Sequence, residues 1–129
     1  MQHNPYICVI DDDTTIGDLI AEVLTDEGYI VLADSTGAGA LPTIAAHPPA
    51  LCLVDLRMPG MSGLDVIEHL RMRGLEQVPV VGMTASTQDA QLVRAAGLVC
   101  LDKPFDIDEL LACVARYVPL QQVLIAQTA

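Results

Sequence analysis

Hydrophobic residues gather in five short runs along the chain, and each run is nearly continuous in apolar side chains. Such runs are typical of parallel strands that are buried on both faces of a sheet. The pattern therefore predicts five strands, at Tyr6–Ile10, Tyr29–Ala33, Leu51–Val54, Val78–Met83 and Leu98–Leu101.

Between these runs, apolar residues recur at intervals of three and four, which is the spacing of a helix with one buried face. Ser62 is the predicted N-cap of one such stretch, and Gly28 and Gly97 follow the ends of two others. The clear helical stretches cover Ile16–Leu24, Leu64–Leu70, Leu92–Ala96 and Ile107–Val118.

A further helix is predicted at about Thr36–His47, but its pattern is weaker because it contains two glycines and Pro42. Proline lacks a backbone N–H and its ring crowds the preceding turn, so it is disfavoured inside a helix. We expect this helix to start late or to be kinked at Pro42.

The resulting order, a strand followed by a helix and repeated five times, predicts an α/β fold. A parallel sheet with helices on both faces and right-handed crossovers satisfies this order. The 129 residues fit one domain, expected at residues 5–119, with residues 120–129 as a short tail or linker. No apolar run is long enough to span a membrane and no signal peptide is visible, so we expect a cytoplasmic protein.

The formal net charge of −11 limits the kinds of partner that the protein is expected to bind. Direct binding of nucleic acid is not expected, because phosphates demand a basic surface. A cation or a basic partner fits this charge better. Lys103 is the only lysine of the chain, so it is a candidate for a specific role.

Polar residues follow the predicted strands at the points where ligands bind in a parallel sheet, beyond the carboxyl ends of the strands. Acids that follow three of the strands, a hydroxyl group and the lysine should therefore meet at one edge. Asp34 follows the second strand, which should lie at the side of the sheet. The residues after the other strands are Asp11, Asp12 and Asp13, then Asp55, then Thr84, and finally Asp102 and Lys103.

The acids, the hydroxyl group and the lysine at this edge together suit a phosphoryl-transfer site. Clustered carboxylates repel one another, and a Mg²⁺ ion held by oxygen ligands would relieve that repulsion. The metal would keep Asp55 ionised and nucleophilic toward phosphorus. Lys103 would neutralise the transferring oxygens, and Thr84 would donate a hydrogen bond to one of them.

Four motifs in order, at fitting spacings, resemble a response-regulator receiver domain: IDDD at Ile10–Asp13, LVDLRMPGMSG at Leu53–Gly63, MTA at Met83–Ala85 and DKPF at Asp102–Phe105. The resemblance covers nearly the whole chain. It implies a flavodoxin-like fold with strand order 2-1-3-4-5. It also implies a phosphorylation-dependent switch of a two-component phosphorelay.

The resemblance assigns a role to each residue of the cluster. Asp55 would be the phosphoacceptor and a metal ligand, and Asp11, Asp12 and the backbone carbonyl of Arg57 would be the other protein ligands of Mg²⁺. Thr84 and Lys103 match the switch hydroxyl and the phosphate-binding lysine of the family. The Lys103–Pro104 peptide bond is expected to be cis.

The implied partners are a sensor histidine kinase or a histidine phosphotransfer protein. The implied output is a downstream protein that binds the face formed by the fourth helix, the fifth strand and the fifth helix. Such a protein catalyses its own phosphorylation and dephosphorylation but is not a metabolic enzyme.

One departure from the family pattern stands out. Cys100 lies three residues before the lysine, where receivers usually have an aromatic residue that changes rotamer on activation. A smaller or different rearrangement is therefore expected. Arg57 and Ser86 occupy positions that tune the lifetime of the phosphoryl group in the family.

A competing interpretation starts from the same acidic motif. IDDDTT also contains DxDxT, the nucleophile motif of haloacid-dehalogenase-like phosphatases, with Asp11 as nucleophile and Asp13 as acid/base. That family needs an acidic motif after another strand beyond the lysine, whereas here only a helix follows. It also leaves the turn after Asp55 unexplained.

Two more interpretations place the chain in binding classes. Asp11, Asp13, Thr15 and Glu22 match ligand positions of a calcium-binding EF-hand loop, but Ile16 stands where that loop needs glycine. The calcium-binding loop is therefore rejected. A phosphorylation-independent binding module of the same fold remains open.

Overall fold

The computed structural model describes residues 5–120 as five parallel strands in the order β2-β1-β3-β4-β5. This confirms the predicted flavodoxin-like fold. The strands are β1 (Tyr6–Ile10), β2 (Ile30–Asp34), β3 (Leu51–Asp55), β4 (Val80–Thr84) and β5 (Val99–Asp102). The helices are α1 (Thr14–Asp26), α2 (Gly37–Ala46), α3 (Gly63–Met72), α4 (Thr87–Ala95) and α5 (Ile107–Tyr117).

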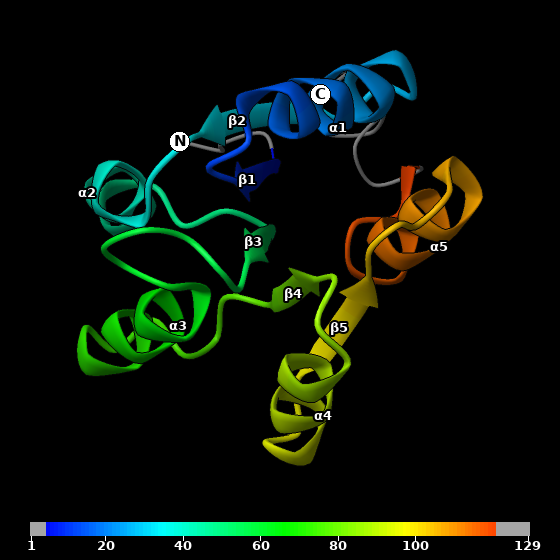
Figure 1. Cartoon of the computed structure of the whole chain (residues 1–129). Helices are drawn as coiled ribbons and strands as arrows, with labels where there is room; N and C mark the ends of the chain where they lie inside the picture. Colours follow the sequence, from blue (N-terminus) through cyan, green and yellow to red (C-terminus); the bar gives the residue numbers. More distant parts are fainter. Residues whose placement is uncertain (1–4, 121–129) are drawn as a thin grey trace.

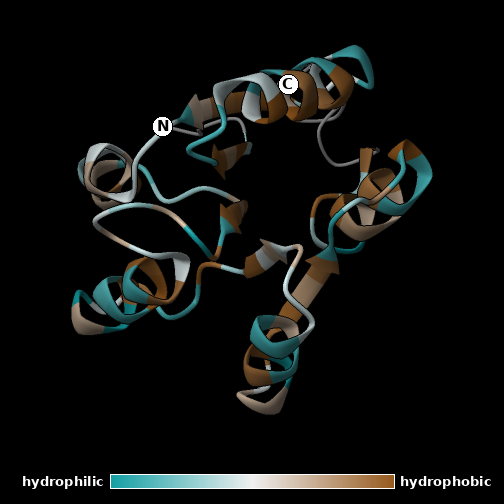
Figure 2. Cartoon of the chain, in the orientation of Figure 1, coloured by the Kyte–Doolittle hydropathy of each residue, from teal (hydrophilic) through white to brown (hydrophobic). Residues whose placement is uncertain are grey.

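The helices cover the sheet on both faces, as Figure 1 shows. Helices α1 and α5 pack on one face, where Ile20, Leu24, Leu110 and Val114 belong to the larger apolar core. Helices α2 and α3 pack on the other face around a second core. Helix α4 shares only a small third cluster with β5 and the residue after β3. Figure 2 shows hydrophobic and hydrophilic stretches alternating along α1, α3 and α4.

Strand β2 departs from the prediction that the strands are buried on both faces. Its residues are exposed or half-buried, with Ile30 at 38% and Leu32 at 39% exposure. The reason is its position, because β2 pairs with β1 alone and lies at the side of the sheet. The apolar residues of this strand alone do not distinguish an edge strand from a central one.

Helix α2 begins at Gly37, so the expectation of a late start is wrong. The Thr36 side chain accepts a hydrogen bond from the Gly39 N–H and caps the helix before Pro42 is reached. A Cβ at Gly37 would lie 2.6 Å from the Val66 side chain, so this glycine lets α2 approach α3 closely. Tertiary packing therefore outweighs the weak helix propensity of this segment.

The described helices confirm the predicted N-cap at Ser62, which forms a reciprocal capping box with Asp65. None of the helices in this part of the chain is long and apolar enough to cross a bilayer. The predicted tail lies outside the described residues beyond Leu120.

Candidate functional site

The predicted polar residues meet at the carboxyl edge of the sheet. Asp55 and Thr84 are the last residues of β3 and β4, and Asp11 and Lys103 follow β1 and β5 directly. Asp11, Asp55 and Thr84 are 2%, 7% and 3% exposed, and they are the buried polar residues of the described chain. Burying such groups is unfavourable unless they are compensated, so their common location marks a site.

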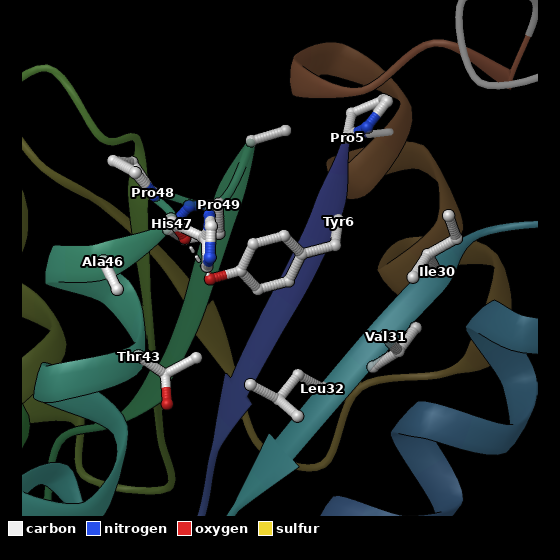
Figure 3. Close-up of a pocket in the computed structure, with 11 residues that line it drawn as sticks. Pro5, Tyr6, Ile30, Val31, Leu32, Thr43, Ala46, His47, Pro48 and Pro49 are labelled. Carbon is white, nitrogen blue, oxygen red and sulfur yellow. Dashed lines mark hydrogen bonds between the residues drawn. The ribbon is translucent and has the colours of Figure 1, made fainter. Parts of the chain in front are cut away.

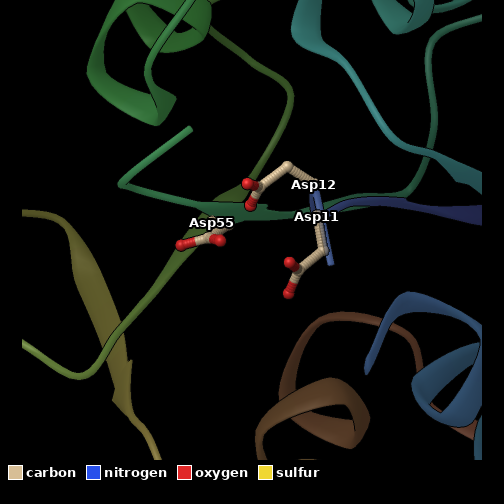
Figure 4. A group of neighbouring side chains, drawn as sticks. All are labelled: Asp11, Asp12 and Asp55. Carbon is tan, nitrogen blue, oxygen red and sulfur yellow. The ribbon is translucent and has the colours of Figure 1, made fainter. Parts of the chain in front are cut away.

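Three carboxylates form the acidic side of this site, as Figure 4 shows. One oxygen each of Asp11, Asp12 and Asp55 lies within 4.8 Å of the others. Asp12 is exposed, whereas the other two are buried. A cluster of carboxylate oxygens open to solvent on one side is a donor set that suits a hard divalent cation.

Lys103 forms the basic side of the site. Its Nζ lies 3.0 Å from Asp11 Oδ2 and 3.6 Å from Asp55 Oδ2, and its side chain is 18% exposed. The backbone N–H of Lys103 donates to the Thr84 carbonyl at 2.8 Å, which joins the ends of β4 and β5. The expected cis bond between Lys103 and Pro104 is confirmed.

The electrostatics of the site centre on Asp55. Burial raises the pKa of its carboxyl group from 3.8 to about 6, while Lys103 lowers it and Asp11 raises it. The Arg57 N–H donates to Asp55 Oδ1 at 3.2 Å and also lowers this pKa. A second cation beside the carboxylates would favour the ionised form of Asp55.

Thr84 and the loop after it complete the pocket. The Thr84 hydroxyl oxygen accepts a hydrogen bond from the Ser86 N–H at 3.0 Å, and its own proton remains for a second partner. A pocket of about 480 Å³ is lined by Asp55, Arg57, Thr84, Ala85, Ser86 and Lys103. This volume accommodates a phosphoryl group between the acid, the hydroxyl and the lysine.

The turn after Asp55 holds that carboxylate in place. Gly60 has a φ of +77°, which favours glycine. A Cβ at Gly63 would lie 2.5 Å from the Asp55 carbonyl oxygen, so α3 starts against the backbone of the acid itself. Gly60 therefore suits the turn itself, and Gly63 allows the close approach of α3 to β3.

Arg57 reaches a residue that the sequence patterns do not single out. Its Nε lies 2.5 Å from Asp89 Oδ2 in the first turn of α4. The two residues are 32 positions apart, and no spacing or motif signals their contact. The Arg57 peptide lies beside Asp55, while the role of its carbonyl as a metal ligand remains a prediction.

Asp13 has a structural role. It is the N-cap of α1, and its Oδ1 accepts hydrogen bonds from the Thr15 and Ile16 N–H groups at 3.0 and 3.3 Å. An acid engaged in this way, outside the pocket, is poorly placed as the general acid of a phosphatase. The haloacid-dehalogenase-like interpretation is therefore not favoured.

A larger hollow, drawn in Figure 3, lies beside the starts of β1 and β2. It has a volume of about 960 Å³ and is mainly apolar, with Tyr6, Ile30, Leu32 and Pro48 among its lining residues. The Tyr6 hydroxyl donates to the His47 carbonyl oxygen there. Since Tyr6 and Ile30 begin their strands, this groove is remote from the carboxylates at the strand ends.

Comparison with known proteins agrees with this geometry. A family model described as the response regulator receiver domain matches residues 7–115. The chain is 42% identical over 109 residues to the transcriptional regulatory protein KdpE of Mycobacterium tuberculosis, covering 82% of this chain and 47% of that protein. It thus spans about half of that relative.

Another relative is matched over nearly its full length. Sporulation initiation phosphotransferase F of Bacillus subtilis is 33% identical over 121 residues, covering 92% of this chain and 97% of that protein. Among solved structures, the response regulator TrrA of Thermotoga maritima, in complex with Mg²⁺–BeF, superposes with a TM-score of 0.79. Its identity is 28%, over 88% of this chain and 99% of TrrA.

These matches cover the strands, the acidic cluster and the lysine together. Proteins of this family are phosphorylation-dependent switches in two-component signalling and not metabolic enzymes. The chain belongs to the response regulator receiver domain family.

Proposed function

We propose that Asp55 is the phosphoacceptor of this receiver and that residues 5–119 form the switching domain. The observation that supports this most is the position of the Asp55 carboxylate. It is buried at the end of β3, lines a pocket with Thr84, and lies 3.6 Å from the Nζ of the only lysine.

The acidic cluster fits a Mg²⁺ ion. Asp11, Asp12 and Asp55 would hold it through carboxylate oxygens, together with the backbone carbonyl of Arg57. When bound, the ion supplies positive charge that neutralises the carboxylates and the phosphoryl oxygens. The approach of three carboxylate oxygens within 4.8 Å supports this assignment.

The donor would be a phosphohistidine of a sensor kinase or a phosphotransfer protein. An Asp55 carboxylate oxygen forms the new bond to phosphorus, while the bond between phosphorus and the imidazole nitrogen breaks. The imidazole keeps that electron pair and ends as neutral histidine after taking up a proton. Lys103 and Thr84 stabilise the oxygens of the transferring group by charge and by a hydrogen bond.

The output would be a change in protein binding at the face formed by α4, β5 and α5. Leu92 on α4 and Ile107 on α5 are 59% and 56% exposed, so both helices offer an apolar side chain to a partner. The net charge of −11 argues against direct contact with nucleic acid. This function is consistent with a cytoplasmic location, where a kinase would present its phosphohistidine.

The test is intact-protein mass after incubation with acetyl phosphate and Mg²⁺. We expect one added phosphoryl group in the parent protein and none in Asp55→Asn. Asp13→Asn is the matched control, because it removes an acid of the same motif outside the pocket, and it should still be modified.

Two results would contradict the proposal. An adduct that persists in Asp55→Asn but disappears in Asp11→Asn, with steady release of phosphate, would favour the phosphatase. If neither acetyl phosphate nor beryllofluoride forms an adduct with the parent, the protein would be a phosphorylation-independent binding module.

A further inference from the structure

Helix α4 has the fewest buried residues of the five described helices. Only Ala90 and Val93 are buried in it, and they belong to the smallest of the apolar clusters. Cys100 contributes to that cluster a side chain of small volume. Figure 1 shows α4 beside β4 and β5, at the end of the molecule farthest from α1. Little apolar area therefore holds this helix, so its polar contacts have more influence on its position.

Two arginines tether α4, one at each end. At its start, Asp89 receives the Arg57 side chain from the loop after β3. Near its end, Arg94 donates to the Cys100 carbonyl at 3.1 Å and to Asp102 Oδ2 at 3.0 Å. The first tether comes from the pocket that contains Asp55, whereas the second joins α4 to β5.

The Arg57 tether is weak enough to be exchanged. The Arg57 side chain is 69% exposed and that of Asp89 is 21% exposed. An ion pair this exposed contributes little to stability, because solvent screens it. If Arg57 leaves, Asp89 remains in the first turn of α4, where the helix dipole favours an anion. The unpaired state of Asp89 is therefore accessible.

A phosphoryl group on Asp55 would create a competitor for Arg57. It carries about two negative charges and three acceptor oxygens, compared with the single charge of the Asp89 carboxylate. Arg57 lines the same pocket and lies two residues after Asp55. Guanidinium groups bind phosphoryl oxygens through paired hydrogen bonds, which favours this new partner.

We propose that Arg57 is a positioning residue that exchanges partners on activation. It holds Asp89 in the resting protein and turns to the phosphoryl oxygens in the phosphorylated protein, which releases the first turn of α4. This inference depends on Asp55 being the phosphoacceptor. It gives the switch a route from the pocket to α4 that does not need a large side chain at Cys100.

The test is hydrogen exchange of the α4 amides with and without beryllofluoride, in the presence of Mg²⁺. In the parent we expect beryllofluoride to speed exchange in the first turn of α4 by up to about fivefold, the equivalent of an exposed ion pair. In Arg57→Ala the exchange should be fast with and without beryllofluoride. The increment, meaning the increase in exchange rate caused by beryllofluoride, should therefore disappear. Arg57→Lys keeps the cation and should retain part of the increment.

Arg94→Ala is the matched control, because it removes the other tether and leaves the pocket intact. It should speed exchange of α4 in both states but preserve the increment caused by beryllofluoride. If Arg57→Ala shows the same increment as the parent, the partner exchange is wrong while the phosphoacceptor proposal stands. If the parent forms no beryllofluoride complex by fluorine NMR, both proposals are wrong.

Discussion

Lys103 and Arg57 both contact acids around the candidate pocket, and their surroundings differ. Lys103 is 18% exposed and its partner Asp11 has a fully buried side chain. Arg57 is 69% exposed and its partner Asp89 lies on α4. Removing one member of a buried pair leaves an uncompensated charge, whereas an exposed pair breaks at little cost.

This difference separates two tasks. The buried pair of Lys103 and Asp11 holds its charges in fixed positions beside the place where a phosphoryl group would be transferred. Charges that are already in position stabilise the charge that develops in a transition state. The exposed pair connects a loop of the pocket to a lightly packed helix, and a weak contact is easily exchanged. The largest effects should therefore follow changes at Lys103 and the backbone of Asp55, and the smallest should follow changes at Arg57.

Lys103→Met should have the largest effect on stability. It leaves Asp11 buried without its cation, so we expect the metal-free protein to lose about 3 kcal/mol in the free energy of unfolding. Phosphorylation by acetyl phosphate should slow by on the order of a hundredfold. Urea unfolding and the time course of intact mass measure these effects. Lys103→Arg keeps the charge and should lose less stability than Lys103→Met. Equal losses in the two variants would show that the charge of Lys103 does not account for the stability.

Gly63→Ala tests the site without removing any charge. The new Cβ would lie 2.5 Å from the Asp55 carbonyl oxygen, so the start of α3 must shift. We expect a loss of about 2 kcal/mol in urea unfolding together with slower phosphorylation. Gly17→Ala, inside α1, is the control: the nearest atom to its new Cβ would be Asp11 Cβ at 3.8 Å, an ordinary contact, and stability should be unchanged or increased. Similar stabilities of the two variants would contradict the tight approach of α3.

Asp55→Asn should stabilise the metal-free protein at neutral pH. Because the folded pKa is about 6 and the ordinary value is 3.8, the folded state binds more protons between these values. The stability associated with protonated Asp55 is present below pH 3.8 and is lost as the pH rises through about 6.

Asparagine does not titrate, so the stability advantage of Asp55→Asn should grow across this window, to about 1 kcal/mol after solvent screening. Thermal unfolding of both proteins from about pH 4 to about pH 7, with chelator, measures it. Added Mg²⁺ should stabilise the parent more than the variant and reduce the difference. A difference that does not vary with pH would contradict the raised pKa.

Arg57→Ala should have the smallest effect. Losing the arginine beside the phosphoryl group exposes it to water, so we expect its lifetime to shorten by up to about fivefold. The affinity for Mg²⁺ should change little, because a backbone carbonyl is the expected ligand. Loss of the phosphoryl adduct over time and Mg²⁺ titration separate the two quantities. An equal lifetime of the phosphoryl group in variant and parent would show that the Arg57 side chain has no part in dephosphorylation.

Much of the fold could be predicted because the signals are local. The apolar runs and helical stripes predict the strand–helix order, and in a parallel sheet that order brings Asp11, Asp55 and Thr84 to one edge. The exposure of β2 depends on which strands neighbour it, and the start of α2 depends on a cap and on packing against α3. The contact between Arg57 and Asp89 joins residues far apart in sequence, so no local pattern reports it.

The most direct test of the central claim is to locate the acyl phosphate. Borohydride reduces an aspartyl phosphate to homoserine, which peptide mass spectrometry identifies by position. After reaction with acetyl phosphate and Mg²⁺, we predict homoserine at position 55 and unchanged aspartate at positions 11, 12 and 13. Homoserine at position 11, with aspartate retained at position 55, would contradict the account and identify Asp11 as the nucleophile.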